Sequence, residues 1–525
     1  MNVPYLSILI VLPLLAALII LFIPEKLKNS YRWITLLAAL VQLWVASMLY
    51  WGFEAVAAAP SELSAYKWVE RYKWLAFGGD GSGLQIDYFV GVDGLSISMV
   101  WLTALVMAVG ALASWHVQDK ARGYFALYGL LSAAIMGCFV ALDFFLFYIF
   151  FEFMLLPMYF LIGLWGGVGR EYASIKFFIY TLVGSLFILV GMIALCTSVQ
   201  ENGVYTFSLP AMMNPHNFAP DALLNVANQT VIAGLPVRHW IFWALVIGFL
   251  IKLPAVPLHT WLPDAHVEAP TAISVVLAGV LLKVGGYGLL RIAYSIFPDA
   301  AAHYAWWLGA LGVLSIIYGA LNALAMHDLK KLIAYSSVSH MGFVLLGIAS
   351  LTHEGVNGAV YQMFSHGIIS AMLFLIVGVL YDRTHDRRIE NYAGLASAMP
   401  RYTFFTAAAF FASLGLPMFS GFIAEALALL GAFKSVHLSP AMAVISTLGI
   451  VLAAAYYLWA FRRMFLGKFW VRGGDSWSAF LVDLTTREML LLMPLALLTL
   501  LFGVYPALLL DKISPTITAF IQMIK

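Results

Sequence analysis

Apolar segments long enough to cross a lipid bilayer recur along the whole chain, and they restrict its fold more than any other feature. A membrane-spanning helix needs about 20 predominantly apolar residues. Such segments fall near residues 5–23, 33–53, 89–115, 123–141, 143–166, 174–199, 238–257, 269–294, 304–326, 332–351, 356–381, 402–431, 438–466 and 488–511. The sequence therefore predicts an all-α integral membrane protein with about 14 transmembrane helices.

Composition supports this class and excludes others. The 525 residues are 63% hydrophobic and 10% charged, with a mean hydropathy of +0.93, which excludes a soluble domain with a single anchor. The net charge of +2 gives no indication of a nucleic-acid partner. Cys138 and Cys196 lie in apolar runs without metal-ligand spacing, so we expect core residues and neither a disulfide nor an iron–sulfur site. The stretch 5–23 lacks a preceding positive charge and a cleavage site, which predicts a retained first span.

The distribution of basic residues predicts the orientation. With the N-terminus outside, eighteen of the 28 Lys and Arg residues fall on the inside and eight on the outside, the latter including Arg291. Lys252 and Lys283 are the remaining two, within spans. Because cytoplasmic loops are enriched in Lys and Arg, this bias favours both termini on the outer side of the membrane.

Charged residues in the middle of the predicted spans indicate function. Lys252 and Lys283 each lie about a dozen residues inside an apolar run, where an unpaired charge costs several kcal/mol or more. Glu152 and Glu425 lie inside other spans, and His340 and His366 lie in two adjacent ones. A row of Glu, Lys and His suits a proton relay, since moving a carboxylate toward a buried lysine switches the protonation of that lysine. The alternatives are lysines that reach the interface and ion pairs that only fix helix register.

Helix-breaking residues accompany three of these charges. Pro and Gly interrupt the helical hydrogen bonds, and transporters use such breaks beside charges to admit water and present helix ends. Pro254 and Pro257 follow Lys252, and Gly285, Gly286 and Gly288 follow Lys283. Gly415, Pro417 and Gly421 precede Glu425.

The polar stretch His259–Thr271 (HTWLPDAHVEAPT) joins two predicted spans on the inner side. Its histidines and acids suggest a metal, but their spacing fits neither HExxH nor an i, i+4 pair. We therefore favour a re-entrant turn that passes protons, and predict no metal and no cofactor-binding residue in this chain. The sequence also has no phosphate-binding loop, dinucleotide fingerprint or paired CxxC, so the energy for any transport must come from outside this chain.

Several runs resemble one family. FFEFMLLPMYFLIGLWG, KLPAVPLHTWLPDAHVEAPT, LLKVGGYGLLR, DLKKLIAYSSVSHMGF and SHGIISAMLF are similar to the antiporter-like membrane subunits of respiratory complex I, a proton-pumping NADH:quinone oxidoreductase. The resemblance covers roughly residues 85–465. It is to the chain M (chain 4) type, because the chain is too short for the lateral helix of chain L, and Glu425 stands where chains L and N carry lysine.

The resemblance implies a fold and a set of roles. It implies two inverted five-helix repeats at 123–294 and 304–466, each with a broken helix, preceded by helices 1–3 at 1–122 and followed by an interfacial segment and last helix at 467–525. Glu152 and Lys252 would form a gating pair, with Lys283 as the central relay. His340 and His366 would belong to the connecting polar axis, and Glu425 would end the second half-channel.

The resemblance also implies partners and location. These are neighbouring complex I membrane subunits, the bilayer of the cell inner membrane, and protons as the transported ion, with FMN, iron–sulfur clusters and quinone held by other subunits. Two alternatives remain: a subunit of a multi-subunit cation/proton antiporter or membrane-bound hydrogenase, and a structural membrane subunit without a pumping role.

Overall fold

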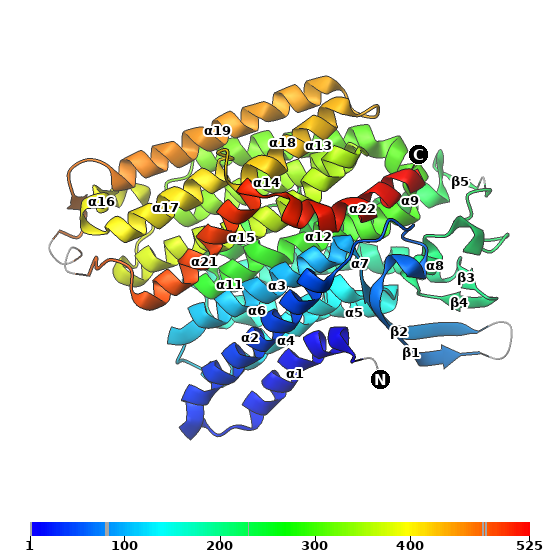
Figure 1. Cartoon of the computed structure of the whole chain (residues 1–525), viewed down its shortest axis with the longest axis horizontal. Helices are drawn as coiled ribbons and strands as arrows, with labels where there is room; N and C mark the ends of the chain where they lie inside the picture. The colour runs from blue at the N-terminus through cyan, green and yellow to red at the C-terminus, as the bar shows by residue number, and fades with distance from the viewer. Residues whose placement is uncertain (1–2, 79–82, 229, 475–476, 478–479, 525) are drawn as a thin grey trace.

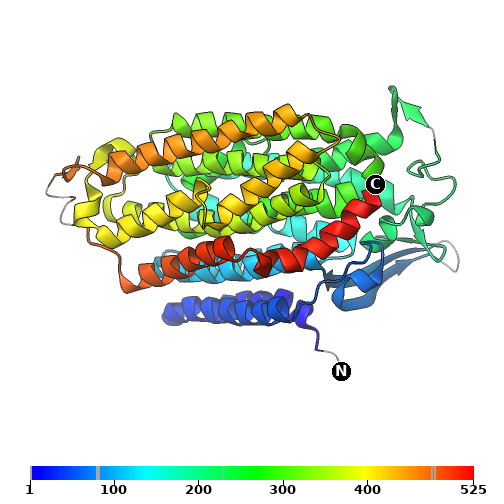
Figure 2. The same ribbon diagram turned by 45° about the horizontal axis from the view of Figure 1, so that its top comes forward.

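Long helices that run roughly side by side make up the computed structural model (Figures 1 and 2). It describes all residues except 1–2, 79–82, 229, 475–476, 478–479 and 525. The helices are α1 (Tyr5–Phe22), α2 (Lys28–Gly52), α3 (Gly94–Ala113), α4 (Ala121–Val140), α5 (Phe144–Phe153), α6 (Leu155–Trp165), α7 (Arg170–Cys196), α8 (Leu209–Met212), α9 (Val237–Lys252), α10 (Trp261–Glu268), α11 (Thr271–Val276), α12 (Leu282–Gly288), α13 (Pro298–Leu324), α14 (Leu329–Ala349), α15 (His353–Thr384), α16 (Leu395–Ala398), α17 (Pro400–Ser413), α18 (Ser420–Lys434), α19 (Pro440–Phe465), α21 (Thr486–Val504) and α22 (Ala507–Ile524). Two π-helical segments, η5 (Leu277–Leu281) and η6 (Leu289–Tyr294), flank α12, and short 3₁₀ segments are η1 (Glu25–Leu27), η2 (Leu63–Ala65), η3 (Ser114–His116), η4 (Pro215–Asn217) and η7 (Ile389–Asn391).

A small sheet covers one end of the bundle, which we call the sheet end (Figure 1). Strands β1 (Lys67–Phe77), β2 (Leu84–Val92), β4 (Val204–Thr206) and β3 (Gln200–Glu201) lie in the order β1-β2-β4-β3, with β2 and β4 parallel. A separate hairpin pairs β5 (Val231–Ile232) with β6 (Leu235–Pro236). Arg71 joins the sheet through ion pairs of 2.7 Å with Asp87 and with Glu201, and its hydrogen bond to Glu201 raises its pKa, so it stays charged.

The sheet adds strands between two predicted spans and corrects one boundary. The connection between the second and third predicted spans, 54–88, contains β1 and the beginning of β2. The third span was predicted to begin at residue 89, whereas α3 begins at Gly94, where Asp93 and Ser96 form a capping box. Alternating residues of β2 are as apolar as a helix end, so hydropathy alone does not separate the two.

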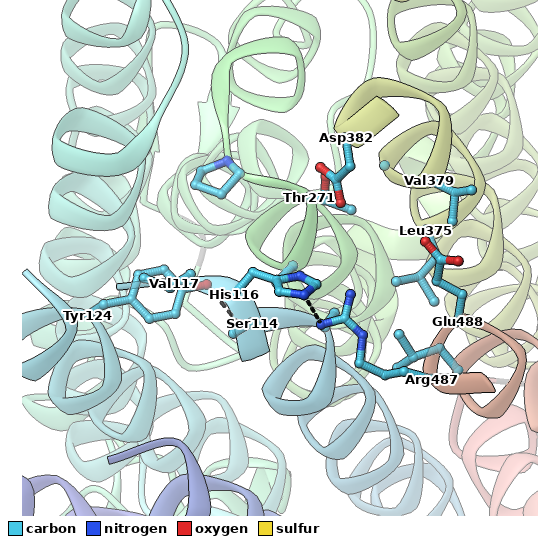
Figure 3. Close-up of a pocket in the computed structure, with 15 residues that line it drawn as sticks. Ser114, His116, Val117, Tyr124, Thr271, Leu375, Val379, Asp382, Arg487 and Glu488 are labelled. Atoms are coloured by element: carbon cyan, nitrogen blue, oxygen red, sulfur yellow. Dashed lines mark hydrogen bonds between the residues drawn. The ribbon is translucent and has the colours of Figure 1, made fainter. Parts of the chain in front are cut away.

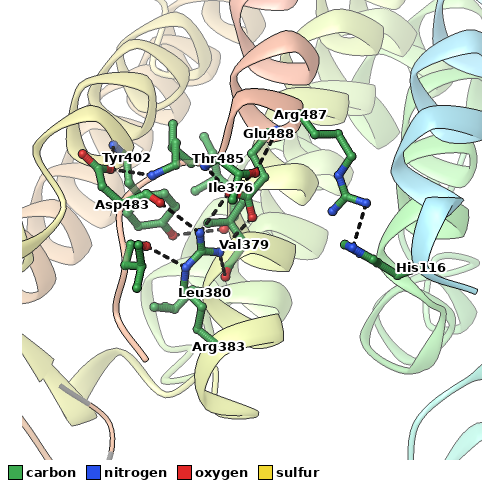
Figure 4. Close-up of polar contacts among 12 residues, drawn as sticks. His116, Ile376, Val379, Leu380, Arg383, Tyr402, Asp483, Thr485, Arg487 and Glu488 are labelled. Carbon is green, nitrogen blue, oxygen red and sulfur yellow. Dashed lines mark hydrogen bonds and ion pairs between the residues drawn. The ribbon is translucent and has the colours of Figure 1, made fainter. Parts of the chain in front are cut away.

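The opposite end carries the turn between α15 and α17 and the strand pair β7 (Tyr392–Ala393) with β8 (Trp470–Val471). Arg383 at the end of α15 contacts both carboxylate oxygens of Glu488 at 2.9 Å and so ties α15 to the start of α21 (Figure 4). The predicted interfacial segment 467–487 lies here. It contains β8 and an extended stretch before Thr485, and part of it lies outside the described residues.

Thirteen helices of the described chain are long and apolar enough to cross a membrane, and twelve of them match predicted spans. The two other predicted spans, 238–257 and 402–431, are the broken helices α9/α10 and α17/α18, each piece of which is shorter than a span. The thirteenth is α22, which was not predicted as a separate helix. Its Lys512 and Thr516 contact Phe53 and Gly94 near the sheet end, so α22 continues α21 toward that end (Figure 2).

The helical membrane fold is thus confirmed, and the described ends of α1 and α22 lie near the same end of the bundle (Figure 1). The core lies around the helices that carry the buried charges. In Thr271–Tyr294 and His353–Thr384, the most apolar 18 residues are all buried inside the protein. In Tyr5–Phe22 and Pro440–Phe465, only 39% of the corresponding residues are buried. Lys283 and His366 therefore belong to central helices, and α1 and α19 are peripheral.

Candidate proton-relay site

Lys283 occupies the centre of the molecule with no solvent exposure. Its ammonium donates to the carbonyl of Ala278, five residues earlier, and lies 2.8 Å from Nδ1 of His366 on α15. Ala278 belongs to the π-helical segment η5. Such segments change the backbone hydrogen-bond ladder and are frequent at functional sites. The widened turn thus places a carbonyl beside Lys283, and two acceptors stabilise the buried amine.

The row continues from His366 to His340 and Glu425. The two imidazole rings lie 5.4 Å apart between centroids, and Nδ1 of His340 is 3.2 Å from Oε1 of Glu425 on α18. These residues, together with Gln362 and Ser413, line a cavity of about 10 Å³. A volume of that order is about the minimum that holds one water molecule. The packing therefore joins the two rings and the carboxylate across three helices.

Two partners of His340 suit its two protonation states. Nδ1 lies 3.2 Å from the amide nitrogen of Gln362 as well as 3.2 Å from the Glu425 carboxylate. A protonated Nδ1 donates to the carboxylate, and an unprotonated Nδ1 accepts from the amide. On its other side, Nε2 contacts Ser413 at 3.2 Å. Ser413 donates to Tyr457, which donates to Ser336. The ring can thus gain or lose a proton without losing its hydrogen bonds.

Lys252 has a different environment. It is the last residue of α9, where the predicted break follows at Leu253 and Pro254, and it is 1% exposed. None of the described residues hydrogen-bonds to its ammonium. The ammonium lies 5.1 Å from the ring centre of Phe151 and 5.6 Å from that of Phe177. Aromatic faces and the negative end of a helix dipole both stabilise a cation.

Glu152 does not pair with Lys252 in this structure. Its carboxylate accepts a hydrogen bond of 2.8 Å from Tyr148 on the preceding turn of α5 and is partly exposed at the edge of the bundle. Lys252 still lies within electrostatic range of Glu152. The structure therefore brings together Lys283, His366, His340 and Glu425, and leaves Glu152 and Lys252 as near but separate groups.

Comparison with known proteins assigns the family. Residues 141–452 match the family described as "NADH:quinone oxidoreductase/Mrp antiporter, TM". The chain is 42% identical over 526 residues to the NADH-quinone oxidoreductase subunit M of Rhodobacter capsulatus, covering 98% of this chain and 96% of that relative. The chain belongs to the NADH:quinone oxidoreductase/Mrp antiporter membrane-subunit family.

Solved structures agree with this assignment. A chain of respiratory complex I from Thermus thermophilus has a TM-score of 0.81 at 30% identity, with 99% of this chain and all of that chain covered. A chain of the Mrp complex from a Dietzia species has a TM-score of 0.80 at 20% identity, with both chains covered fully, and shares the fold. The family match falls within the two predicted halves, 123–294 and 304–466; their relation as inverted repeats stays a prediction.

The glycines beside Lys283 have a different role from the one expected. They were expected to open room for water on the lysine's own helix. Instead, a Cβ atom at Gly285 would lie 2.5 Å from the backbone nitrogen of Leu253, and one at Gly286 would lie 2.5 Å from the sulfur of Met363. Gly288 likewise has no room beside the ring of Phe249. Gly285 and Gly288 let the Lys283 helix pack directly against the end of α9, and Gly286 lets it pack against α15.

Sequence reasoning missed a buried ion pair and misplaced its arginine. Arg291 was counted as an outside loop residue, but it is 2% exposed and its Nη2 lies 2.5 Å from Oδ1 of Asp93. Arg291 also contacts Tyr287 and Tyr66. Its position inside the apolar run 269–294 was the available signal. The pair ties the π-helical segment η6 to the start of α3, at the sheet end of the helix that carries Lys283.

The stretch His259–Thr271 forms the short helix α10 and two tight connections. Asp264 forms an ion pair of 2.7 Å with Lys176, and Glu268 accepts from the backbone of Gly169 at 2.9 Å. In the described part of the chain, no three His, Cys, Asp or Glu residues are grouped as metal ligands.

From the sequence, His266 of α10 was considered only as a possible metal ligand in the stretch His259–Thr271, and Lys330 was not selected. Lys330 was counted as a loop residue, yet it is buried and donates to the carbonyl of Ala269 at 2.6 Å. His266 is fully buried, and neither of its ring nitrogens has a hydrogen-bonding partner among the described residues. A buried unsatisfied polar group costs about 1–3 kcal/mol, which is uncommon in native proteins and calls for an explanation.

Proposed function

We propose that this chain translocates protons as a membrane subunit of a quinone-reducing respiratory complex, with Lys283, His366, His340 and Glu425 as its continuous relay. The observation that carries the proposal is the row of contacts from the Lys283 ammonium to the Glu425 carboxylate inside wholly buried helices. Charged groups inside a membrane are costly, so a linked set of them supports transport rather than simple packing.

The relatives support the kind of complex. The Rhodobacter capsulatus relative is named as a subunit of NADH-quinone oxidoreductase, and its identity extends over nearly the whole chain. The likeness to the Mrp complex supports the fold alone. In this proposal the flavin, the iron–sulfur clusters and the quinone belong to other subunits. This chain would then supply only the proton pathway, and energy would reach it through contacts with neighbouring membrane subunits.

In the proposed roles, Lys283 holds a proton at the centre and His366 accepts it at Nδ1. His340 passes the proton on, and the Glu425 carboxylate receives it beside the break between α17 and α18. Glu152 and Lys252 form a gate: a carboxylate that approaches Lys252 favours its charged form, and one that moves away favours release of the proton. Their separation in this structure corresponds to the open arrangement of the gate.

The proposed orientation places the sheet end outside the cell and the opposite end in the cytoplasm. Arg383, Arg387, Arg388, Arg462 and Arg463 lie at or near the opposite end, as the enrichment of basic residues on the cytoplasmic side requires. A cysteine introduced at 382–401 should react with a membrane-impermeant reagent only from the inside. Reaction from the outside would reverse the orientation.

Glu425→Gln tests the relay, because the amide keeps the size of the side chain and cannot ionise. We expect the assembled complex in proteoliposomes to translocate fewer protons per quinone reduced. Glu354→Gln is the matched control, since Glu354 pairs at 2.6 Å with Lys434 at the protein surface. Unchanged proton translocation by an assembled Glu425→Gln complex would contradict the proposed function of this row.

A further inference from the structure

A cleft at the cytoplasmic end lies between α3, α11, α15 and α21 and has a volume of about 230 Å³ (Figure 3). Charged side chains stand around it. Arg487 contacts Nε2 of His116 at 3.2 Å, and Glu488 is held by Arg383 (Figure 4). Asp382 lies on the α15 side of the cleft and Thr271 on the α11 side. The cleft therefore combines charged and apolar side chains, and α11 and α15, which continue toward Lys283 and His366, form part of its wall.

The inner wall of the cleft leads to His266. Thr271 packs so closely on Gly378 that a Cβ atom there would not fit. One helical turn deeper on α11, Ser274 donates to the carbonyl of His266 at 3.1 Å. One turn deeper on α15, Phe374 stacks on the His266 ring, with centroids 4.5 Å apart and planes 12° apart. His266 of α10 thus contacts both α11 and α15 one helical turn deeper than the wall of the cleft.

On its other side, His266 lies toward the relay, because His266 and Lys283 contact the same two helical segments. His266 contacts Ser274 and Phe374, whereas Lys283 contacts Ala278, one turn further along the helix that begins with α11, and His366, about two turns further along α15. Lys330 donates to the carbonyls of Val267 and Ala269 at the end of α10. Both ring nitrogens of His266 lack a partner among the described residues, so no hydrogen bond fixes its tautomer.

We propose that His266 transfers protons from the cytoplasmic cleft to Lys283. One ring nitrogen binds a proton from the solvent of the cleft, and the other ring nitrogen releases its proton through intervening water to the neutral amine of Lys283. The amine becomes an ammonium, the ring returns to a neutral form as the other tautomer, and no electrons move. The inference rests on the proposed function, since it names the group that loads the central lysine.

The first experiment compares two histidines of the same region in the assembled complex. His266→Gln keeps a polar side chain of similar size but cannot carry a proton, and we expect it to lower proton translocation per quinone reduced several-fold. His259→Gln is the matched control. His259 is also buried and has an unpartnered ring nitrogen, but it packs on Tyr318 and Tyr335 rather than on α15.

A second pair of variants separates proton transfer from packing. His266→Phe keeps the stacking on Phe374 and has no nitrogen, so it should pump as poorly as His266→Gln. His266→Ala leaves space beyond the cleft, and added imidazole should restore part of its pumping while leaving Lys283→Ala unrestored. Wild-type pumping by the assembled His266→Phe complex would overturn the inference.

Lys283→Ala distinguishes the two levels of failure. If Lys283→Ala loses pumping and His266→Gln retains it, the proposed function stands and the role of His266 is wrong. If Lys283→Ala itself pumps normally, the relay of the proposed function fails, and the inference fails with it.

Discussion

The two broken helices hold their charges in different ways. At the first break, between α9 and α10, Lys252 ends a helix and has aromatic rings but no hydrogen-bonding partner among the described residues. At the second break, between α17 and α18, Glu425 lies one turn and a half into the following helix and contacts His340. The first charge is stabilised by a helix end and the second by a paired side chain.

The polar groups of the two regions therefore form two parts: a continuous part from Lys283 to Glu425, and an interrupted part from Glu152 to Lys283. From Lys283 to Glu425 each group is in contact with, or packed next to, the following one. Between Glu152, Lys252 and Lys283 the described residues form no hydrogen bond or ion pair. A broken helix therefore does not determine by itself whether its charge belongs to a fixed network. In the proposed function, the interrupted first part would serve as the switch and the continuous second part would conduct protons.

The largest effect is expected at Lys283, where the two parts meet. Lys283→Ala removes the central proton carrier, and Lys283→Arg keeps a charge that does not release its proton. Both should lower proton translocation by about tenfold or more, toward the range that loss of a proton-transfer group costs. Proton uptake and quinone reduction by the assembled complex measure this, with the exposed Lys434→Arg as the control. Full pumping by Lys283→Arg would mean that the lysine acts only as a fixed charge.

The sequence was sufficient for most of the spans and for the breaks and charged residues of both regions, whereas α22 and the start of α3 were not predicted. Hydropathy over about 20 residues identifies a span without its partners, and Pro254 or Gly415 marks a break within its own helix. The residues of the proposed relay were selected for the same reason, because a lysine, glutamate or histidine is conspicuous in an apolar run.

Contacts between distant segments were not predictable in this way. Arg291 and Asp93 are 198 positions apart, and Lys283 and His366 are 83 apart. The unpaired state of Lys252 and the position of His266 beyond the cleft depend on the packing of several helices. The π-helical turns beside Lys283 contain no proline that would have indicated them in the sequence. The glycines after Lys283 were expected to leave open space, but neighbouring helices pack closely against them.

A pair of double-mutant cycles would sharpen the comparison, with an intermediate effect. In the second region, Glu425→Gln and His340→Asn remove partners in contact, so their effects on the apparent Tm of the complex should deviate from additivity by roughly 2 °C. In the first region, Glu152→Gln and Lys252→Met should be nearly additive, because no hydrogen bond or ion pair joins these residues. Thermal denaturation of the purified complexes measures both cycles. Strong coupling between Glu152 and Lys252 would show that the gate is closed in the resting protein.

The smallest effect is expected at the glycine of the second break. Gly415 has a φ of +75°, and a Cβ atom there would lie 2.7 Å from the carboxylate of Glu425. Gly415→Ala should therefore cost about 1–2 kcal/mol of backbone strain and also push Glu425 away from His340. Gly203→Ala is the matched control, since its φ is +81° and a Cβ atom there meets no other atom within 4 Å. Both variants should be slightly less stable, but only Gly415→Ala should lower pumping, by about two- to threefold, since a displaced carboxylate receives protons less efficiently. If both variants pump equally well, the close approach of Gly415 does not position the Glu425 carboxylate. The contact with His340 would then be sufficient to hold that carboxylate in place.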